Sequence, residues 1–153
     1  MKLLCDEMLH RLGRWLRAAG YDTAIASGGA ADAELLRAAA EESRVLLTRD
    51  RELAARKRQP CRIVGLRQAG LAATARALSE RLPIDWLHAP FTRCLVDNAP
   101  LRPAGPVEAA LAPTDVSANI GAITRCPECG RLYWRGGHVA RMTAQLANWQ
   151  NAG

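Results

Sequence analysis

The sequence predicts an α/β fold in which a parallel sheet carries helices on both faces, followed by a tail that a metal ion holds together. Short apolar runs alternate with helical segments from residue 1 to about residue 88, and this alternation is typical of three-layer α/β/α domains. Beyond it, a Cys-x-x-(Asp or Cys) motif occurs twice. We therefore expect two parts, residues 1–88 and residues 89–153, with different architectures.

Each element of the first part follows from a local pattern. Residues 9–19 place apolar side chains at helical spacing, and Gly20 favours a helix end because glycine adopts positive φ easily. Asp32 is expected to cap a second helix, and Pro83 to end the last one. The expected strands are residues 3–5, 23–26, 45–47 and 62–66, and the expected helices are residues 9–19, the segment after Asp32, 51–58 and 71–82.

The tail is expected to be less regular. Residues 98–122 are rich in Pro, Ala and Gly and show little periodicity, so we interpret them as an irregular insertion between the two motifs. Residues 138–149 favour a terminal helix. Because regular structure is scarce between the two motifs, we expect the metal that they bind to hold the tail together.

Charge and cysteine content restrict the class of protein. The formal net charge is +6 and the pI is about 9.5, which favours an anionic partner such as nucleic acid, although a basic surface can also serve solubility alone. The number of cysteines, five, is odd, and Cys5 and Cys61 lie in apolar runs. Both observations argue against a disulfide-rich secreted scaffold. Without a signal-peptide pattern or an apolar run of about 20 residues, we expect a cytoplasmic protein outside membranes.

Residues 92–98 and 124–130 share the pattern Thr-Arg-Cys-x-x-(Asp/Cys)-(Asn/Gly). A tight turn that presents two ligands to one metal favours a residue tolerant of positive φ directly afterwards, and Asn98 and Gly130 meet that demand. Two such turns facing each other form a zinc ribbon. The expected zinc ligands are Cys94, Asp97, Cys126 and Cys129. Asp97 replaces the fourth cysteine, which its carboxylate oxygen allows, and His138 is the alternative fourth ligand.

Three carboxylates far apart in sequence are expected to meet at one edge of the sheet. Asp6 and Asp50 follow two strands at their carboxyl ends, and Asp32 begins a helix that opens on the same edge, where such sheets bind ligands. We call Asp6, Asp32 and Asp50 the acidic rim; Glu7 and Glu34 are adjacent to it. Clustered carboxylates favour Mg²⁺ or Mn²⁺, which acidifies water and stabilises charge on an attacked phosphate. Alternatively, Asp32 and Asp50 only cap helices, and Asp6 is a solvated strand end.

Four segments in order resemble the PIN-like nucleases, and with the cysteine tail the chain resembles the Mut-seven C-terminal ribonuclease domain family. In the tail, the residues that carry the resemblance are Cys126-Pro127-Glu128-Cys129-Gly130, with Tyr133, Trp134 and His138. The four segments are Leu3-Leu4-Cys5-Asp6-Glu7-Met8-Leu9, Leu16-Arg17-Ala18-Ala19-Gly20-Tyr21-Asp22, Asp32-Ala33-Glu34-Leu35-Leu36 and Val45-Leu46-Leu47-Thr48-Arg49-Asp50.

The resemblance implies a PIN-like α/β/α domain with a C-terminal zinc ribbon. It implies a Mg²⁺- or Mn²⁺-dependent endoribonuclease that leaves 5′ phosphates, with the acidic rim as the catalytic residues, Glu7 as a helper and Glu34 as a second candidate helper. Asp22 is a candidate for a further acidic residue of this family, but it also fits the turn after Gly20. Asp97 departs from the family, which usually has cysteine there.

Basic and aromatic residues suggest how RNA would be held. Arg11, Arg14 and Arg17 recur every third residue of the first helix and, with Arg49, are expected to contact RNA phosphates; a solvated helix face is the alternative. Trp134 and its neighbours would either stack on unpaired bases or pack the ribbon. We expect hydrolysis of single-stranded or loop RNA. A non-catalytic RNA-binding zinc-ribbon module is the alternative. The ribbon could also bind a protein partner.

Overall fold

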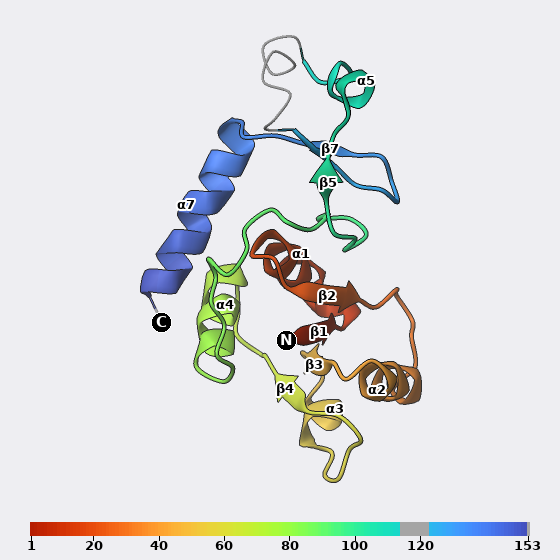
Figure 1. The fold of residues 1–153 in the computed structure, drawn as a ribbon. Helices are drawn as coiled ribbons and strands as arrows, with labels where there is room; N and C mark the ends of the chain where they lie inside the picture. The colour runs from red at the N-terminus through yellow and green to blue at the C-terminus, as the bar shows by residue number, and fades with distance from the viewer. Residues whose placement is uncertain (114–122, 153) are drawn as a thin grey trace.

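The computed structural model describes residues 1–113 and 123–152 and has a mixed α/β fold (Figure 1). Its central sheet consists of four parallel strands in the order β2-β1-β3-β4. The strands are β1 (Lys2–Cys5), β2 (Asp22–Ile25), β3 (Val45–Thr48) and β4 (Ile63–Gly65). All four strands that the apolar runs predict are therefore present, and their bounds differ by no more than one residue.

Helices connect the strands in the predicted order. They are the 3₁₀ turn η1 (Glu7–Leu9), α1 (His10–Ala18), α2 (Asp32–Glu41), α3 (Arg51–Ala55) and α4 (Leu71–Ser79). Gly20, with φ of +98°, follows α1 as predicted. The prediction that Asp32 caps α2 is wrong, because Ala31 is the N-cap residue. The carboxylate of Glu34 accepts a hydrogen bond from the Ala31 N–H at 3.3 Å, which leaves Asp32 in the first turn.

Alternate residues of the strands face two separate cores. Leu3, Cys5 and Leu47 pack with α1 and α4, whereas Leu4 and Leu46 pack with α2 and α3. This follows from the strand period of two, which sends neighbouring side chains to opposite faces. The sheet is therefore covered on both faces, as the alternation of strands and helices predicts.

The tail contains a second, three-stranded antiparallel sheet in the order β5-β6-β7. Its strands are β5 (Arg102–Pro103), β6 (Thr124–Arg125) and β7 (Leu132–Tyr133). The prediction that residues 98–122 are irregular is wrong for β5 and for the short helix α5 (Pro106–Ala109). β5 is an edge strand, where Pro103 is tolerated, and Pro106 suits the first turn of a helix. Residues 114–122 of that segment lie outside the described residues.

The last helix, α7 (Gly137–Asn151), packs against the first part of the chain. Its Trp149 meets Trp15 and Trp86 edge to face, with ring centroids 4.8 Å and 4.9 Å apart. Figure 1 shows α7 running back past α4. The predicted terminal helix is therefore present and contributes to the core beside α1 and α4. In the described ranges, no helix combines the length and the apolar character that a membrane crossing requires.

Candidate functional site

Asp6 is a buried carboxylate, 7% exposed, directly after β1. Its Oδ1 accepts a hydrogen bond from the Leu9 N–H at 3.0 Å. Its Oδ2 accepts from the Thr48 hydroxyl at 2.6 Å and from the Arg49 N–H at 2.8 Å. A carboxylate has about four acceptor positions, so these three bonds hold Asp6 in place and leave capacity for a further ligand.

Thr48 links Asp6 to Asp50 through one buried hydroxyl. While it donates to Asp6, the same oxygen accepts a hydrogen bond from the Asp50 N–H at 2.9 Å. The side chain is completely buried at the end of β3. Thr48 is not among the functional residues predicted from the sequence, although its place between an apolar strand and an acidic residue is a usable signal.

The other carboxylates are held more loosely. Asp50 caps α3, because its Oδ1 accepts from the N–H groups of Glu52 and Leu53 at 2.7 and 2.9 Å. Capping uses one oxygen and leaves Oδ2 available. Asp32 forms a half-exposed ion pair with Arg56 at 2.5 Å, and Glu7 accepts from the Gly29 N–H at 2.9 Å.

The acidic rim and Glu7 line one small depression of about 130 Å³. Thr48 lines it as well, whereas Glu34 does not. Asp22 lies at the opposite edge of the sheet, opposite Lys2 at the start of β1. Mg²⁺ is usually held by one or two carboxylates together with waters and substrate phosphates. The depression therefore offers the right kind of donor for a divalent ion shared with a phosphate.

The tail gathers a second group of metal-ligating side chains, which we call the knuckle cluster: Cys94, Asp97, Cys126 and Cys129. One ligand atom from each lies within 4.8 Å of all the others. The sulfurs of Cys94 and Cys129 are 3.7 Å apart, and Asp97 Oδ1 is 3.2 Å from the Cys126 sulfur. Tetrahedral zinc with Zn–S bonds of about 2.3 Å places its sulfurs about 3.8 Å apart. The cluster could therefore hold a metal such as zinc.

The two turns that form the knuckle cluster have the same backbone geometry. Asn98 and Gly130 both have φ of 72°, as their positions in the motif predict. Their N–H groups donate to the carbonyls of Cys94 and Cys126 at 3.1 and 3.0 Å. The repeat in the sequence thus corresponds to a repeat in structure.

Asp97, and not His138, is the fourth member of the knuckle cluster. Although Asp97 is exposed, desolvation by its neighbours acts to raise the pKa of its carboxyl. Hydrogen bonds from the three cysteine thiols outweigh this effect and hold the pKa well below its usual range. The Tyr133 hydroxyl also contacts this cluster, 3.1 Å from the Cys94 sulfur. A carboxylate together with three cysteine sulfurs, which bind metal as thiolates, is a suitable ligand set for zinc.

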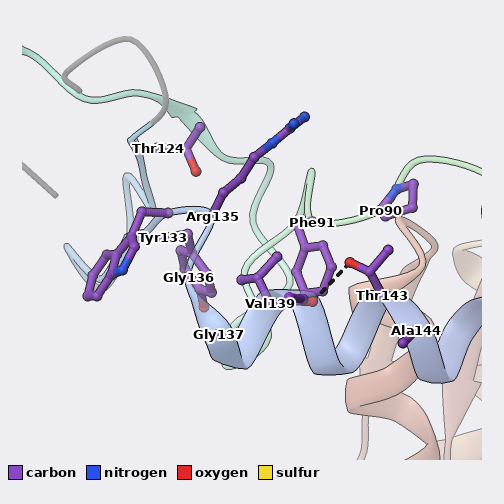
Figure 2. Close-up of a pocket in the computed structure, with 12 residues that line it drawn as sticks. Pro90, Phe91, Thr124, Tyr133, Arg135, Gly136, Gly137, Val139, Thr143 and Ala144 are labelled. Atoms are coloured by element: carbon purple, nitrogen blue, oxygen red, sulfur yellow. Dashed lines mark hydrogen bonds between the residues drawn. The ribbon is translucent and has the colours of Figure 1, made fainter.

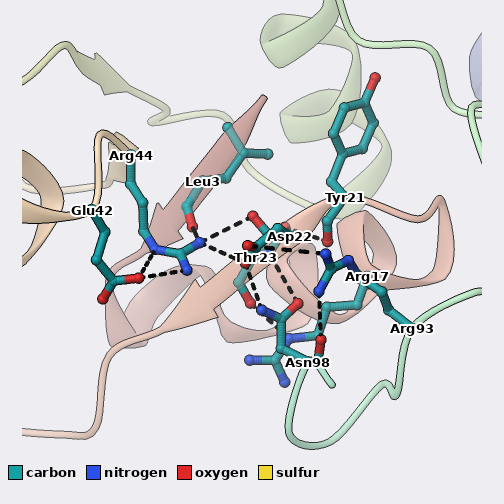
Figure 3. A network of polar contacts seen from close by, with 9 residues as sticks. All are labelled: Leu3, Arg17, Tyr21, Asp22, Thr23, Glu42, Arg44, Arg93 and Asn98. Atoms are coloured by element: carbon teal, nitrogen blue, oxygen red, sulfur yellow. Dashed lines mark hydrogen bonds and ion pairs between the residues drawn. The ribbon is translucent and has the colours of Figure 1, made fainter. Parts of the chain in front are cut away.

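A polar network joins the first turn of the knuckle cluster to the central sheet. Figure 3 shows Asp22 at its centre: its Oδ1 accepts from Arg44 and from the Asn98 amide, both at 2.7 Å. The Asn98 amide oxygen in turn accepts from the Thr23 N–H at 2.9 Å. Asp22 therefore helps to hold the tail against β2. It lies at the amino-terminal ends of the strands, away from the acidic rim.

The basic residues on α1 differ in exposure. Arg11 and Arg14 are exposed, but Arg17 is only 6% exposed. Its guanidinium donates to the carbonyls of Thr23 and Val96 at 2.8 and 2.5 Å. The three-residue spacing therefore does not give three equivalent surface charges, because Arg17 fastens the tail to β2. Arg49 is half-exposed beside the acidic rim.

Comparison with known proteins agrees with this arrangement. The family model of the Mut7-C RNAse domain matches residues 1–146, nearly the whole chain. The chain belongs to the Mut7-C RNase domain family. This membership confirms the resemblance seen in the sequence and indicates a ribonuclease-type function with RNA as the substrate. No curated protein and no solved structure gives a significant match to this Mut7-C chain.

Proposed function

We propose that this Mut7-C chain is a Mg²⁺- or Mn²⁺-dependent endoribonuclease that hydrolyses phosphodiester bonds in single-stranded or loop RNA. The observation that carries the proposal is the gathering of Asp6, Glu7, Asp32 and Asp50 around one depression in a member of an RNase family. Four carboxylates repel one another and need a cation or a protein charge beside them. Among the described residues, the one ion pair that any of these four carboxylates forms is that of Asp32 with Arg56.

The acidic rim would hold the divalent ion. Such an ion acidifies water and stabilises negative charge on a phosphate. Asp6 serves as the fixed member, because its three hydrogen bonds restrict it. Asp50 would offer the oxygen that does not cap α3. Asp32 would offer its carboxylate in place of its contact with Arg56, whose loss costs little because exposed ion pairs contribute only about 0–1 kcal/mol.

Other residues would orient the substrate. Arg11 and Arg14 are exposed on α1, and Arg49 is half-exposed beside the acidic rim. All three are proposed to contact phosphates. Arg17 is left out of this group because its guanidinium is engaged with backbone carbonyls. Glu7 also lines the depression and is proposed to position water or the metal's outer ligands.

We also propose the finer description of the fold. Residues 1–88 would be the PIN-like nuclease domain and residues 89–153 a zinc-ribbon tail with structural Zn²⁺. In support, the central sheet is parallel with helices on both faces, and the knuckle cluster has the spacing of a tetrahedral zinc site.

The mode of cleavage is tested with a circular single-stranded RNA, which has no ends. An endonuclease converts the circle to a linear product, whose 5′ phosphate is detected by its ligation to a labelled acceptor. We expect linear product only when Mn²⁺ or Mg²⁺ is present. If the circle is bound but stays intact under all metal conditions, the chain is the non-catalytic RNA-binding module instead.

A further inference from the structure

Three further depressions follow one another from the acidic rim to the tail. The first, of about 490 Å³, shares Ala26 with the rim depression and is lined by His10, Arg14 and Arg131. The second, of about 410 Å³, shares Arg14 and Arg131 with the first and reaches Trp134. The third, of about 1070 Å³, shares Trp134 with the second. Because of these shared residues, each depression adjoins the next on the surface.

The charge of this surface is opposite to that of the acidic rim. Within the described part of the chain, no carboxylate lines any of the three depressions. The accessible arginines along it are Arg14, Arg131 and Arg135, all exposed. Arginines spaced along a groove suit a chain of phosphates, since each can bind a phosphate through paired N–H groups. An anionic polymer is thus the occupant that the charges favour.

Trp134 adds a flat aromatic surface to this path. It is half-buried and packs on one side against the small tail core that contains Ala109 and Ile123. It also forms a wall of both the second and the third depression. Figure 2 shows Phe91 and Val139 beside each other along the third depression, with Arg135 extending away from α7. Aromatic surfaces beside cations are typical of sites that bind single-stranded nucleic acid.

We propose that the three depressions form a track for single-stranded RNA, which leads from the acidic rim to Trp134. Arg14, Arg131 and Arg135 bind successive phosphates, and Trp134 stacks on an unpaired base. The track admits single strands because only unpaired bases can stack on a side chain in this way. This inference rests on the proposed ribonuclease function and adds to it the side of the molecule from which the strand approaches.

The test measures RNA binding without cleavage, in zinc-loaded full-length Asp50→Asn protein free of Mg²⁺ and Mn²⁺. Labelled single-stranded RNAs of 4 and 12 nucleotides are titrated by fluorescence anisotropy over a range of salt concentrations. Adding Trp134→Leu, which keeps an apolar side chain against the tail core, is expected to weaken 12-nucleotide binding by at least about 5-fold, and to reduce the advantage over the 4-nucleotide RNA. Adding Arg131→Gln is expected to reduce the salt slope by about 0.7.

Arg76→Gln on α4 is the matched control, since Arg76 is exposed and outside the depressions. If Trp134→Leu and Arg131→Gln bind the 12-nucleotide RNA like this control, with zinc content and melting temperature unchanged, the track is wrong. That outcome leaves the nuclease assignment standing. Conversely, suppose that the variants lose RNA binding while the parent protein fails to cut RNA with any metal. That result supports the track and overturns the assignment of nuclease activity. Equal weakening of duplex and single-stranded RNA contradicts the stacking role.

Discussion

At the scale of single residues, the candidate site depends on hydrogen bonds that hold its carboxylates in position. Thr48 is the clearest case, because its hydroxyl joins Asp6 and the backbone of Asp50. Asp6 and Asp50 lie on separate elements, and no other side chain is recorded as joining the two among the described residues. The spacing of the acidic rim is therefore set partly by a neutral residue.

Replacing Thr48 by valine tests this role. Valine keeps the shape but removes the hydroxyl, so the Asp50 N–H loses its partner and Asp6 Oδ2 keeps only the hydrogen bond from the Arg49 N–H. We expect a stability loss of about 1–3 kcal/mol and a lower kcat, together with a higher Mn²⁺ requirement. Thr48→Ser, which keeps the hydroxyl, should restore most of both. Equal activity and equal metal requirement in Thr48→Val and the parent would refute the positioning role.

Asp22 gives a prediction about pH. Burial alone would raise the pKa of this carboxyl, but hydrogen bonds from Arg44 and Asn98 lower it overall. A depressed folded-state pKa contributes stability that is complete above the unfolded value near 3.8 and is lost as pH falls below it. We expect Asp22→Asn to cost about 2 kcal/mol at neutral pH and less at pH 3, as measured by urea unfolding at both values. A penalty independent of pH would contradict this account.

At the scale of elements, the two turns of the knuckle cluster are nearly identical in backbone but different in ligands. Positive φ at Asn98 and Gly130 follows from the motif, so the sequence was sufficient to predict these turns. β5 could not be predicted, because a strand of two residues has no hydrophobic period. Its existence depends on pairing with Arg125 and Thr124, across the segment that separates them.

Zinc affinity should follow the identity of residue 97. Asp97→Cys completes a four-sulfur site and should bind zinc more tightly than the parent, whereas Asp97→Ala should weaken binding more than about 10-fold. Competition with a chromophoric chelator measures both. His138→Ala is the control, because His138 is outside the knuckle cluster. Weaker zinc binding in His138→Ala together with unchanged binding in Asp97→Ala would mean that histidine is the fourth ligand.

At the scale of the whole molecule, the tail and the central sheet are joined by buried polar and apolar contacts. Arg17 binds carbonyls next to the knuckle cluster, and Trp149 of α7 packs between Trp15 and Trp86. The sequence predicted the four strands of the central sheet, the helices that connect them and the gathering of Cys94, Asp97, Cys126 and Cys129, because these follow from local patterns. It did not predict the burial of Arg17, because that depends on carbonyls 78 and 79 residues away. For the same reason the Arg56 partner of Asp32 was not foreseen.

The most direct test of the central claim is cleavage of a labelled single-stranded RNA by the purified protein with Mn²⁺ or Mg²⁺. Asp50→Asn is compared with Glu52→Gln, a neighbouring acidic residue of α3 that does not line the rim depression. We predict that the parent protein cuts the RNA only with metal and that EDTA abolishes the cutting. Asp50→Asn should reduce the cleavage rate at least about 100-fold, whereas Glu52→Gln should keep it. Cutting that persists in Asp50→Asn, or RNA binding without any cutting by the parent protein, would contradict the assignment of the acidic rim as a nuclease site.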